Sequence, residues 1–248
     1  MSQELATPFD GVITIHQHLI RSSERRPTNS ALRPAAGERP AWVPTYELVP
    51  YEAVVTTGLG LSAWDDFHAI PDETLDNAIG RIIDTEGPVH FRVLAERLLE
   101  AADVGRLGSR IRERIQARLD ALEAHGELVQ RDAFSGRAEQ FRVPRLRDWS
   151  SVADKLRDLD YVPDTELMLA IFHAVLEEEG IAVEDAMNNG IYRMGFTRLT
   201  DNAKARLRQP LEALLGEGMV RTRTARFGWD GRPSGGHRLS RPSRGATR

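Results

Sequence analysis

The 248-residue sequence contains no cysteine, which excludes disulfides, thiolate nucleophiles and cysteine-ligated metals. It has no apolar run approaching the roughly 18–20 residues that a membrane-spanning helix needs. Its first ten residues, MSQELATPFD, lack the basic and apolar regions of a secretory signal. These absences predict a cytoplasmic protein that does not associate with a membrane.

Motifs for chemistry are missing as well. The sequence has no GxxxxGK[ST] phosphate loop and no nuclease pattern of acids followed by ExK. His16 and His18 form an HxH pair, but no third ligand follows at a typical spacing, which favours two histidines on a strand over a metal site. We therefore predict a protein that is not an enzyme, with no catalytic residues, no metal and no cofactor.

The formal charge of −4 is unevenly distributed along the chain. Residues 221–248 hold eight arginines and one acid, a balance of +7, and the first 45 residues carry +1, so residues 46–220 carry −12. An acidic body argues against a protein that coats DNA, because such a surface should be basic. It allows a local basic patch or a protein partner.

The stretch from Gly105 to Gly126 predicts a long amphipathic helix with one apolar stripe, formed by Ile111, Ile115, Leu119 and Leu122. Ser109 stands where an N-cap is expected, and Gly126 stands where the helix should stop. Two shorter helices are predicted before it, the first beginning after Pro71. Two short strands around a turn at Ser135-Gly136 are predicted after it. Three helices followed by a ribbon is the order of a winged helix-turn-helix domain.

The second half of the sequence repeats the first. IPDETLDNAIGRIIDTEG aligns with VPDTELMLAIFHAVLEEEG, and LDALEAHGELV aligns with LEALLGEGMVR, both at an offset of 92 residues. The repeat indicates an internal duplication, and convergent helix patterning is the alternative. Pro210 is expected to kink or break the third helix of the second copy.

The predicted fold class is therefore mostly α with small β-ribbons, arranged as tandem winged helix-turn-helix domains. The predicted organisation is an N-terminal arm and linker (1–45), a first winged-helix domain (46–143), a connector (144–162), a second winged-helix domain (163–230) and a disordered basic tail (231–248).

Three strings in the first copy, EGPVH, LAERL and GRLGSRIRERI, resemble a helicase-associated domain of unknown function at the C-terminus of large bacterial superfamily 1 helicases. Some of those proteins also carry a very-short-patch-repair-like endonuclease domain. The matching positions are Glu86, Gly87, Pro88, Val89, His90, Leu94, Ala95, Arg97, Gly105, Arg106, Gly108, Ser109, Arg110 and Ile111. The resemblance spans residues 46–225 and implies a nucleic-acid transaction in mobile-element or phage defence. It also implies that a motor or nuclease is a separate chain, because the phosphate loop is missing here.

Candidate DNA contacts lie on the two predicted third helices and on the ribbon: Arg106, Arg110, Arg112, Arg114 and Arg137 in the first copy, and Arg198, Lys204 and Arg206 in the second. The alternative for these residues is a solvated helix face with pairs such as Arg110 and Glu113.

Two hypotheses for function follow. In the first, the chain is a non-catalytic DNA-binding accessory subunit of a bacterial DNA-processing or phage-defence complex, which acts with a separate helicase, ATPase or nuclease subunit. In the second, it is a tandem winged-helix protein-interaction subunit that bridges a larger ATPase complex without reading DNA. The basic helix and tail favour the first hypothesis, and the acidic body favours the second. Both are compatible with a homo-oligomer.

Overall fold

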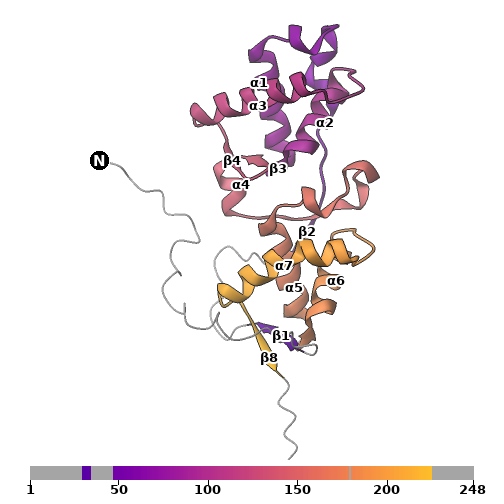
Figure 1. Cartoon of the computed structure of the whole chain (residues 1–248), viewed down its shortest axis with the longest axis vertical. Coiled ribbons are helices and arrows are strands. Elements are labelled where there is room, and N and C mark those ends of the chain that lie inside the picture. The colour runs from indigo at the N-terminus through magenta and orange to yellow at the C-terminus, as the bar shows by residue number, and fades with distance from the viewer. Residues whose placement is uncertain (1–29, 35–46, 179, 225–248) are drawn as a thin grey trace, which may run out of the picture.

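The computed structural model describes residues 30–34, 47–178 and 180–224. In these ranges the protein is mostly helical with three small sheets, as predicted. Figure 1 shows two helical units stacked along the long axis of the molecule. No helix in the described ranges is long and apolar enough to cross a membrane. The HxH pair and the basic tail lie outside the described residues.

The first unit has three helices of similar length around one apolar core. Its elements are β2 (Leu48–Pro50), the 3-10 turns η1 (Thr56–Leu59), η2 (Leu61–Ala63) and η3 (Phe67–Ala69), α1 (Asp72–Glu86), β3 (Val89–His90), α2 (Phe91–Ala101), α3 (Ser109–Ala124), β4 (Val129–Arg131), β5 (Phe134–Gly136) and α4 (Ala138–Arg142). The inward faces of α1, α2 and α3 supply the fully buried Leu75, Ile79, Ile82, Leu94, Leu98, Ile115 and Leu119. The antiparallel sheet has the order β3-β5-β4.

The second unit has the same sequence of helices. Its elements are β6 (Leu146–Asp148), the 3-10 turns η4 (Trp149–Ser151), η5 (Asp154–Leu156) and η6 (Leu159–Tyr161), α5 (Asp164–Glu177), β7 (Ile181–Ala182), α6 (Val183–Arg193), α7 (Asp201–Gly216) and β8 (Val220–Thr224). Strand β1 (Ser30–Pro34) from the N-terminal segment joins this unit in a sheet of order β7-β1-β8. Strands β2 and β6, the first element of each unit, pair in parallel.

The structure confirms the 92-residue repeat element by element. Helix α6 begins and ends 92 residues after α2, and α7 begins and ends 92 residues after α3. Smaller features repeat too, since Asp66 and Asp158 each accept a hydrogen bond from a backbone N–H two residues later. Gly126 and Gly218 both adopt a left-handed conformation after the long helix. The two units therefore share local structure as well as helix order.

Helix ends and one helix interior differ from the prediction. The N-cap of α3 is Gly108 rather than Ser109, and α7 is capped by the Thr200 hydroxyl, which accepts from the Ala203 N–H. Helix α7 runs unbroken through Pro210, whose ring is buried with Leu207 and its neighbours. Apolar burial on that face offsets the hydrogen bond that proline removes.

The ribbon turn and the linker also differ from the prediction. The turn between β4 and β5 lies at Asp132-Ala133, where Asp132 adopts the left-handed φ of 53°, and not at Ser135-Gly136. Gly136 is instead the last residue of β5, and glycine suits this position because a Cβ there would lie 3.2 Å from the Pro88 Cα. The segment predicted as a linker contains β1, which lies in a sheet with β7 and β8.

A buried network of charges joins the two units. Arg147 on β6 and Glu166 on α5 are 4% and 2% exposed, and the Arg147 Nη2 lies 2.6 Å from the Glu166 Oε2. Arg147 also donates through Nη1 to the Glu86 carbonyl oxygen at the end of α1, at 2.6 Å. Burial is the largest single effect on the pKa of Arg147 and lowers it, but the attraction and hydrogen bonds of Glu166, together with Tyr51 and Glu86, raise this pKa overall.

Glu86 extends the network into the first unit. Its buried carboxylate accepts from the Tyr51 hydroxyl at 2.6 Å and from the Arg97 Nε at 2.9 Å. The Tyr51 ring lies 4.5 Å from the Trp149 ring, and the Arg147 guanidinium lies over both rings. Two carboxylates and two guanidiniums are thus desolvated together with their partners in place, which fixes how the units meet.

We expect Arg147→Met to destabilise the protein by about 3–5 kcal/mol, because it leaves the Glu166 carboxylate buried without its cation. Urea unfolding followed by far-UV circular dichroism measures this loss. The double variant Arg147→Met with Glu166→Gln is the control, since it removes both charges and should recover about half of the lost stability or more. A loss below about 1 kcal/mol for the single variant would contradict the role given to the pair.

Candidate nucleic-acid interface

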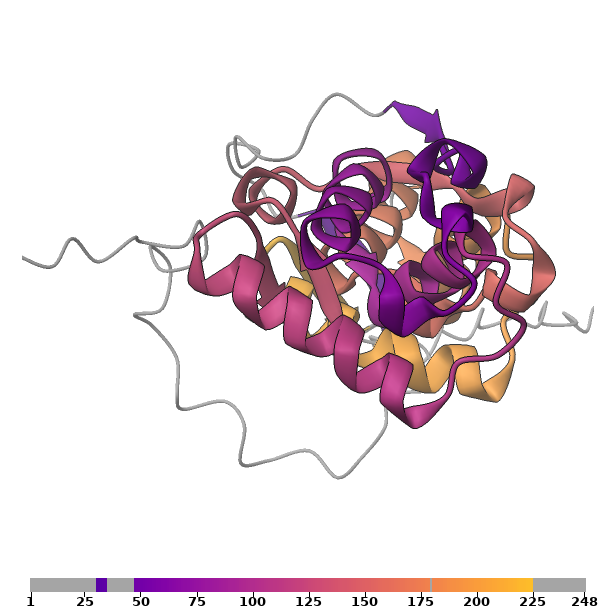
Figure 2. The same ribbon diagram turned by 90° about the horizontal axis from the view of Figure 1, so that it is seen from above.

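The two long helices lie on the same side of the molecule. Figure 1 shows α3 and α7 across the front of their units, and the view from above in Figure 2 places both along one edge. In both helices the N-terminal end follows an exposed loop, which contains Arg106 before α3 and Arg198 before α7. Within the described residues, the starts of both helices are therefore exposed on this side.

Three of the predicted DNA contacts are exposed near these N-terminal ends, namely Arg106, Arg110 and Arg198. No hydrogen bond or ion pair joins their side chains to another residue in the part of the chain that the structure describes. Arg112 is exposed as well, and its guanidinium lies 5.3 Å from the centroid of the Phe91 ring. These four cations remain available to a ligand.

Arg114 and Arg206 stabilise their own units. Arg114 donates to the carbonyl oxygens of residues 67, 68 and 70 and to the Asp72 carboxylate. Arg206 donates to the carbonyl oxygens of residues 159 and 162 and pairs with Asp164 at 2.6 Å. Each arginine therefore ties the long helix to the turn that precedes the first helix of its unit, at equivalent positions of the repeat.

Arg137 and Lys204 are also engaged within the chain. Arg137 does not lie at the tip of the ribbon; it follows β5, and its Nε lies 2.7 Å from the Asp84 Oδ1. Lys204 pairs with Glu184 on the neighbouring helix α6 at 3.0 Å. The turn at Asp132-Ala133 forms the ribbon tip instead, so this tip presents a carboxylate rather than a guanidinium.

The C-terminal half of α3 is acidic. Gln130 on β4 donates its side-chain amide to Asp120 at 3.1 Å and to Glu123 at 3.0 Å, and its backbone N–H donates to Glu123 at 2.7 Å. Hydrogen bonds from Gln130 and Gln116 hold the pKa of Asp120 below its usual value. This half of the helix therefore presents two carboxylates, those of Asp120 and Glu123.

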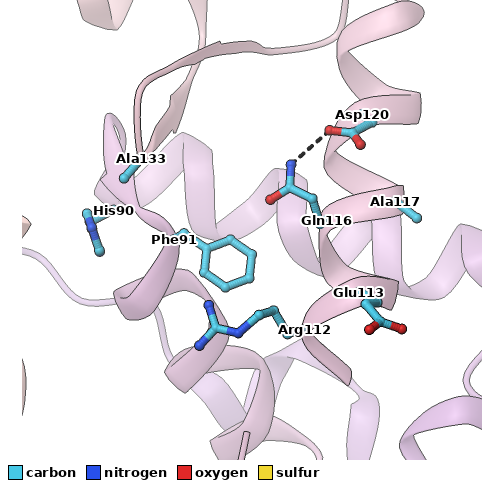
Figure 3. A pocket seen from close by; sticks show the side chains of 8 residues that line it. All are labelled: His90, Phe91, Arg112, Glu113, Gln116, Ala117, Asp120 and Ala133. Carbon is cyan, nitrogen blue, oxygen red and sulfur yellow. Dashed lines mark hydrogen bonds between the residues drawn. The ribbon is translucent and has the colours of Figure 1, made fainter. Parts of the chain in front are cut away.

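A surface cavity of about 610 Å³ lies between the start of α2, the exposed face of α3 and the ribbon turn. Its lining consists of His90, Phe91, Arg112, Glu113, Gln116, Ala117, Asp120 and Ala133. Figure 3 shows the Phe91 ring projecting toward α3, between Arg112 and Gln116. Phe91 is only half-buried, at the start of α2. Its place as the first residue of a helix was the signal that its ring lies at the edge of the core.

His90 forms one end of this cavity and caps α2. Its Nδ1 accepts from the Arg92 backbone N–H at 3.0 Å. The centroid of its ring lies 4.6 Å from that of Tyr161, in a tilted arrangement, and 5.2 Å from that of Phe134, in an edge-to-face arrangement. Burial lowers the pKa of His90, against a smaller opposing effect of the Asp160 carboxylate. The ring is therefore neutral at pH 7, with its proton on Nε2, as the bond to Nδ1 requires.

Comparisons with known proteins give one partial match. A family model described as a protein of unknown function (DUF3320) matches residues 65–113, from η3 to the first turn of α3. No curated protein and no solved structure matches the chain. Within the described ranges, no three histidine, aspartate or glutamate side chains gather as metal ligands. The match covers only part of the first unit, and the description of the family assigns no activity to it.

Arg114→Ala and Arg110→Ala test which of the two arginines stabilises the fold. We expect Arg114→Ala to cost about 1–3 kcal/mol of unfolding free energy, because it leaves buried carbonyl oxygens without a donor. Arg110→Ala should change the unfolding free energy by less than about 0.5 kcal/mol, since its side chain is exposed. Thermal and urea unfolding of the two variants test this difference, and equal losses would contradict it.

His90 provides a pH test. Its folded pKa lies below the ordinary 6.5, so the unfolded chain takes up the proton first, and stability falls as the pH drops below 6.5. His90→Asn keeps a capping acceptor but does not titrate. The stability advantage of the parent protein over His90→Asn should therefore shrink between about pH 7.5 and pH 5. A His90 pKa at or above 6.5 in an NMR titration would contradict this assignment.

Proposed function

We propose that both units are winged helix-turn-helix domains. The first unit has the order helix, strand, helix, helix, strand, strand, and its last strand lies in the middle of the sheet. The second unit repeats this order up to β8, and β1 takes the middle place of its sheet. This element order and the 92-residue repeat support the assignment. In such domains the long third helix presents its N-terminal residues to DNA.

The function that this geometry supports best is binding of duplex DNA by the N-terminal ends of α3 and α7. The observation that carries it is the set of exposed arginines without partners in the described structure, Arg106 and Arg110 on one unit and Arg198 on the other. Guanidinium groups at helix ends bind phosphate oxygens and base edges. One chain offers two such helices on one side, as a symmetric dimer does with two subunits (Figure 2).

The chain is proposed to act as an accessory subunit in a DNA-processing or phage-defence complex. It has no phosphate loop, so a motor or nuclease is a separate chain in this proposal. The resemblance to a helicase-associated domain supports this context, and the matched family of unknown function is consistent with it. An accessory subunit needs a surface for DNA and a second surface for its partner.

Protein docking at the Phe91 cavity is the second candidate function. The cavity has an aromatic side wall, and two carboxylates, those of Glu113 and Asp120, lie on the α3 side. Such a site suits an apolar side chain next to a basic residue of a partner protein, because the apolar group fills the cavity and the cation meets the carboxylates. The acidic half of α3 favours this partner over phosphate.

Duplex binding across a salt series tests the first candidate. We expect Arg106→Ala with Arg110→Ala to weaken binding of a fluorescent duplex about tenfold and to reduce the salt slope by about 1–2, because two phosphate contacts are lost. Arg142→Ala is the matched control, since Arg142 is an exposed arginine on α4 that pairs with Glu139 of the same short helix.

A version ending at Asp230 separates the helices from the basic tail. Truncation should weaken binding without removing the effect of the double variant, if the helix ends contact DNA. If only the truncation matters, or no duplex binds, the proposal for α3 and α7 fails and docking at the Phe91 cavity becomes the leading function.

A further inference from the structure

The two small sheets differ in where their middle strand comes from. In the first unit the middle strand is β5, which follows β4 directly through the two-residue turn at Asp132-Ala133. In the second unit the middle strand is β1, which stands about 150 residues earlier in the chain than its partner β7 (Figure 1). The second unit therefore takes its third strand from the N-terminal segment.

The pairing of β1 reproduces that of β5 residue by residue. Ser135 pairs with Val89 and Gln130, and Leu32 pairs with Ile181 and Thr222. Ile181 stands 92 residues after Val89, and Thr222 stands 92 residues after Gln130, as the repeat requires. Phe134 and Gly136 correspond to Ala31 and Arg33 in the same way, and both middle strands run antiparallel to both neighbours. Strand β1 thus occupies the β5 position of the second unit without any shift.

The repeat also places another segment in that position. Residues 226–228 stand 92 residues after β5, and they read Arg-Phe-Gly, followed by Trp229. Aromatic residues favour strands, and these follow directly after β8. With the register of the first unit, a two-residue turn at Thr224-Ala225 would bring residues 226–228 between β7 and β8.

The turn residues explain why β1 occupies the site in the structure. Asp132, the first turn residue of the first unit, has a left-handed φ of 53°. Aspartate tolerates this conformation, whereas the β-branched Thr224 at the equivalent position does not. A hairpin from β8 to residues 226–228 is therefore strained at its turn, and a strand that arrives from elsewhere in the chain carries no such strain.

We propose that the space between β7 and β8 is a strand-acceptor site, and that residues 226–228 are its second occupant, in exchange with β1. The consequence for DNA rests on the proposed function: entry of residues 226–228 into the site would draw the start of the basic C-terminal segment into the sheet and displace β1. The exchange itself does not depend on DNA binding.

A cysteine-competition experiment on the full-length chain tests the exchange, because the parent protein has no cysteine. Ala31 and Ala182 are strand partners, and the repeat makes Arg226 the equivalent partner of Ala182. Opposite residues in antiparallel strands lie within disulfide range. The triple variant carries Ala31→Cys, Ala182→Cys and Arg226→Cys. In a glutathione buffer the cysteine at position 182 can form a disulfide with position 31 or with position 226, and peptide mapping gives the ratio of the two disulfides.

We expect the 31–182 disulfide to predominate. Adding Thr224→Asn with Ala225→Gly creates a favoured two-residue turn and should shift the ratio about tenfold toward the 182–226 disulfide. Leu32→Pro should shift it in the same direction, because it removes a strand hydrogen bond. As a control, Ala182→Cys with Ser62→Cys should form no disulfide within the chain, since Ser62 lies on η2 of the first unit.

Three outcomes would overturn the proposal. One is a ratio that neither the new turn nor Leu32→Pro changes, which shows that the two segments do not compete. Another is the absence of a 31–182 disulfide, which removes β1 from the site. The third is a 31–182 disulfide that forms only between different chains, which makes β1 a link between copies. The assay contains no DNA, so a failure of DNA binding leaves its outcome unchanged.

Discussion

The desolvated ion pair between Arg147 and Glu166 is the interaction on which the relative placement of the units depends. Arg147 lies on β6 and Glu166 on α5, both in the second unit, and the third partner is the Glu86 carbonyl of the first unit. A buried guanidinium keeps a fixed position relative to its partners, because any shift leaves a buried charge without a partner. The aromatic rings of Tyr51 and Trp149 exclude water from the same place.

This rigid joint has a consequence for recognition. Two helices held on one side of a molecule can contact one ligand together without a further loss of conformational freedom on binding. The same arrangement limits the ligand, since α3 is basic at its start and acidic toward its end. A duplex that meets the N-terminal ends of α3 and α7 leaves the acidic half of α3 and the Phe91 cavity free for a protein. DNA binding and partner docking are therefore compatible on this face.

The helices could be predicted from the sequence, and several of the side-chain contacts could not. The spacing of apolar residues along a segment shows which face of a helix is buried, so α1, α2 and α3 could be predicted. The 92-residue repeat was evident because two pairs of aligned strings share one offset. Arg114 and Arg206 looked like free cations, because the carbonyl oxygens that bind them belong to turns more than 40 residues earlier, whose geometry the sequence does not display. Arg147 and Glu166 carried no signal, since a buried ion pair looks like two surface charges. Strand β1 was missed because five residues rich in turn formers show no alternation.

The comparison of the two units shows where the duplication has diverged. Arg114 and Arg206 make equivalent bonds in the two units, and α6 and α7 keep the lengths of α2 and α3. The helix caps differ, since His90 caps α2 through its side chain and Ala182 makes no such bond before α6. Arg118, which pairs with Asp76 in the first unit, is replaced by Pro210 in the second. The ribbon turn has lost the aspartate that favours it, and the sheet takes a strand from the other end of the chain. That strand precedes the first unit, so a segment from the N-terminal side of the chain completes the sheet of the second unit in the described structure. Strands β1 and β8, from opposite sides of the two units in the sequence, are therefore coupled through one sheet, in a protein whose units share a rigid joint.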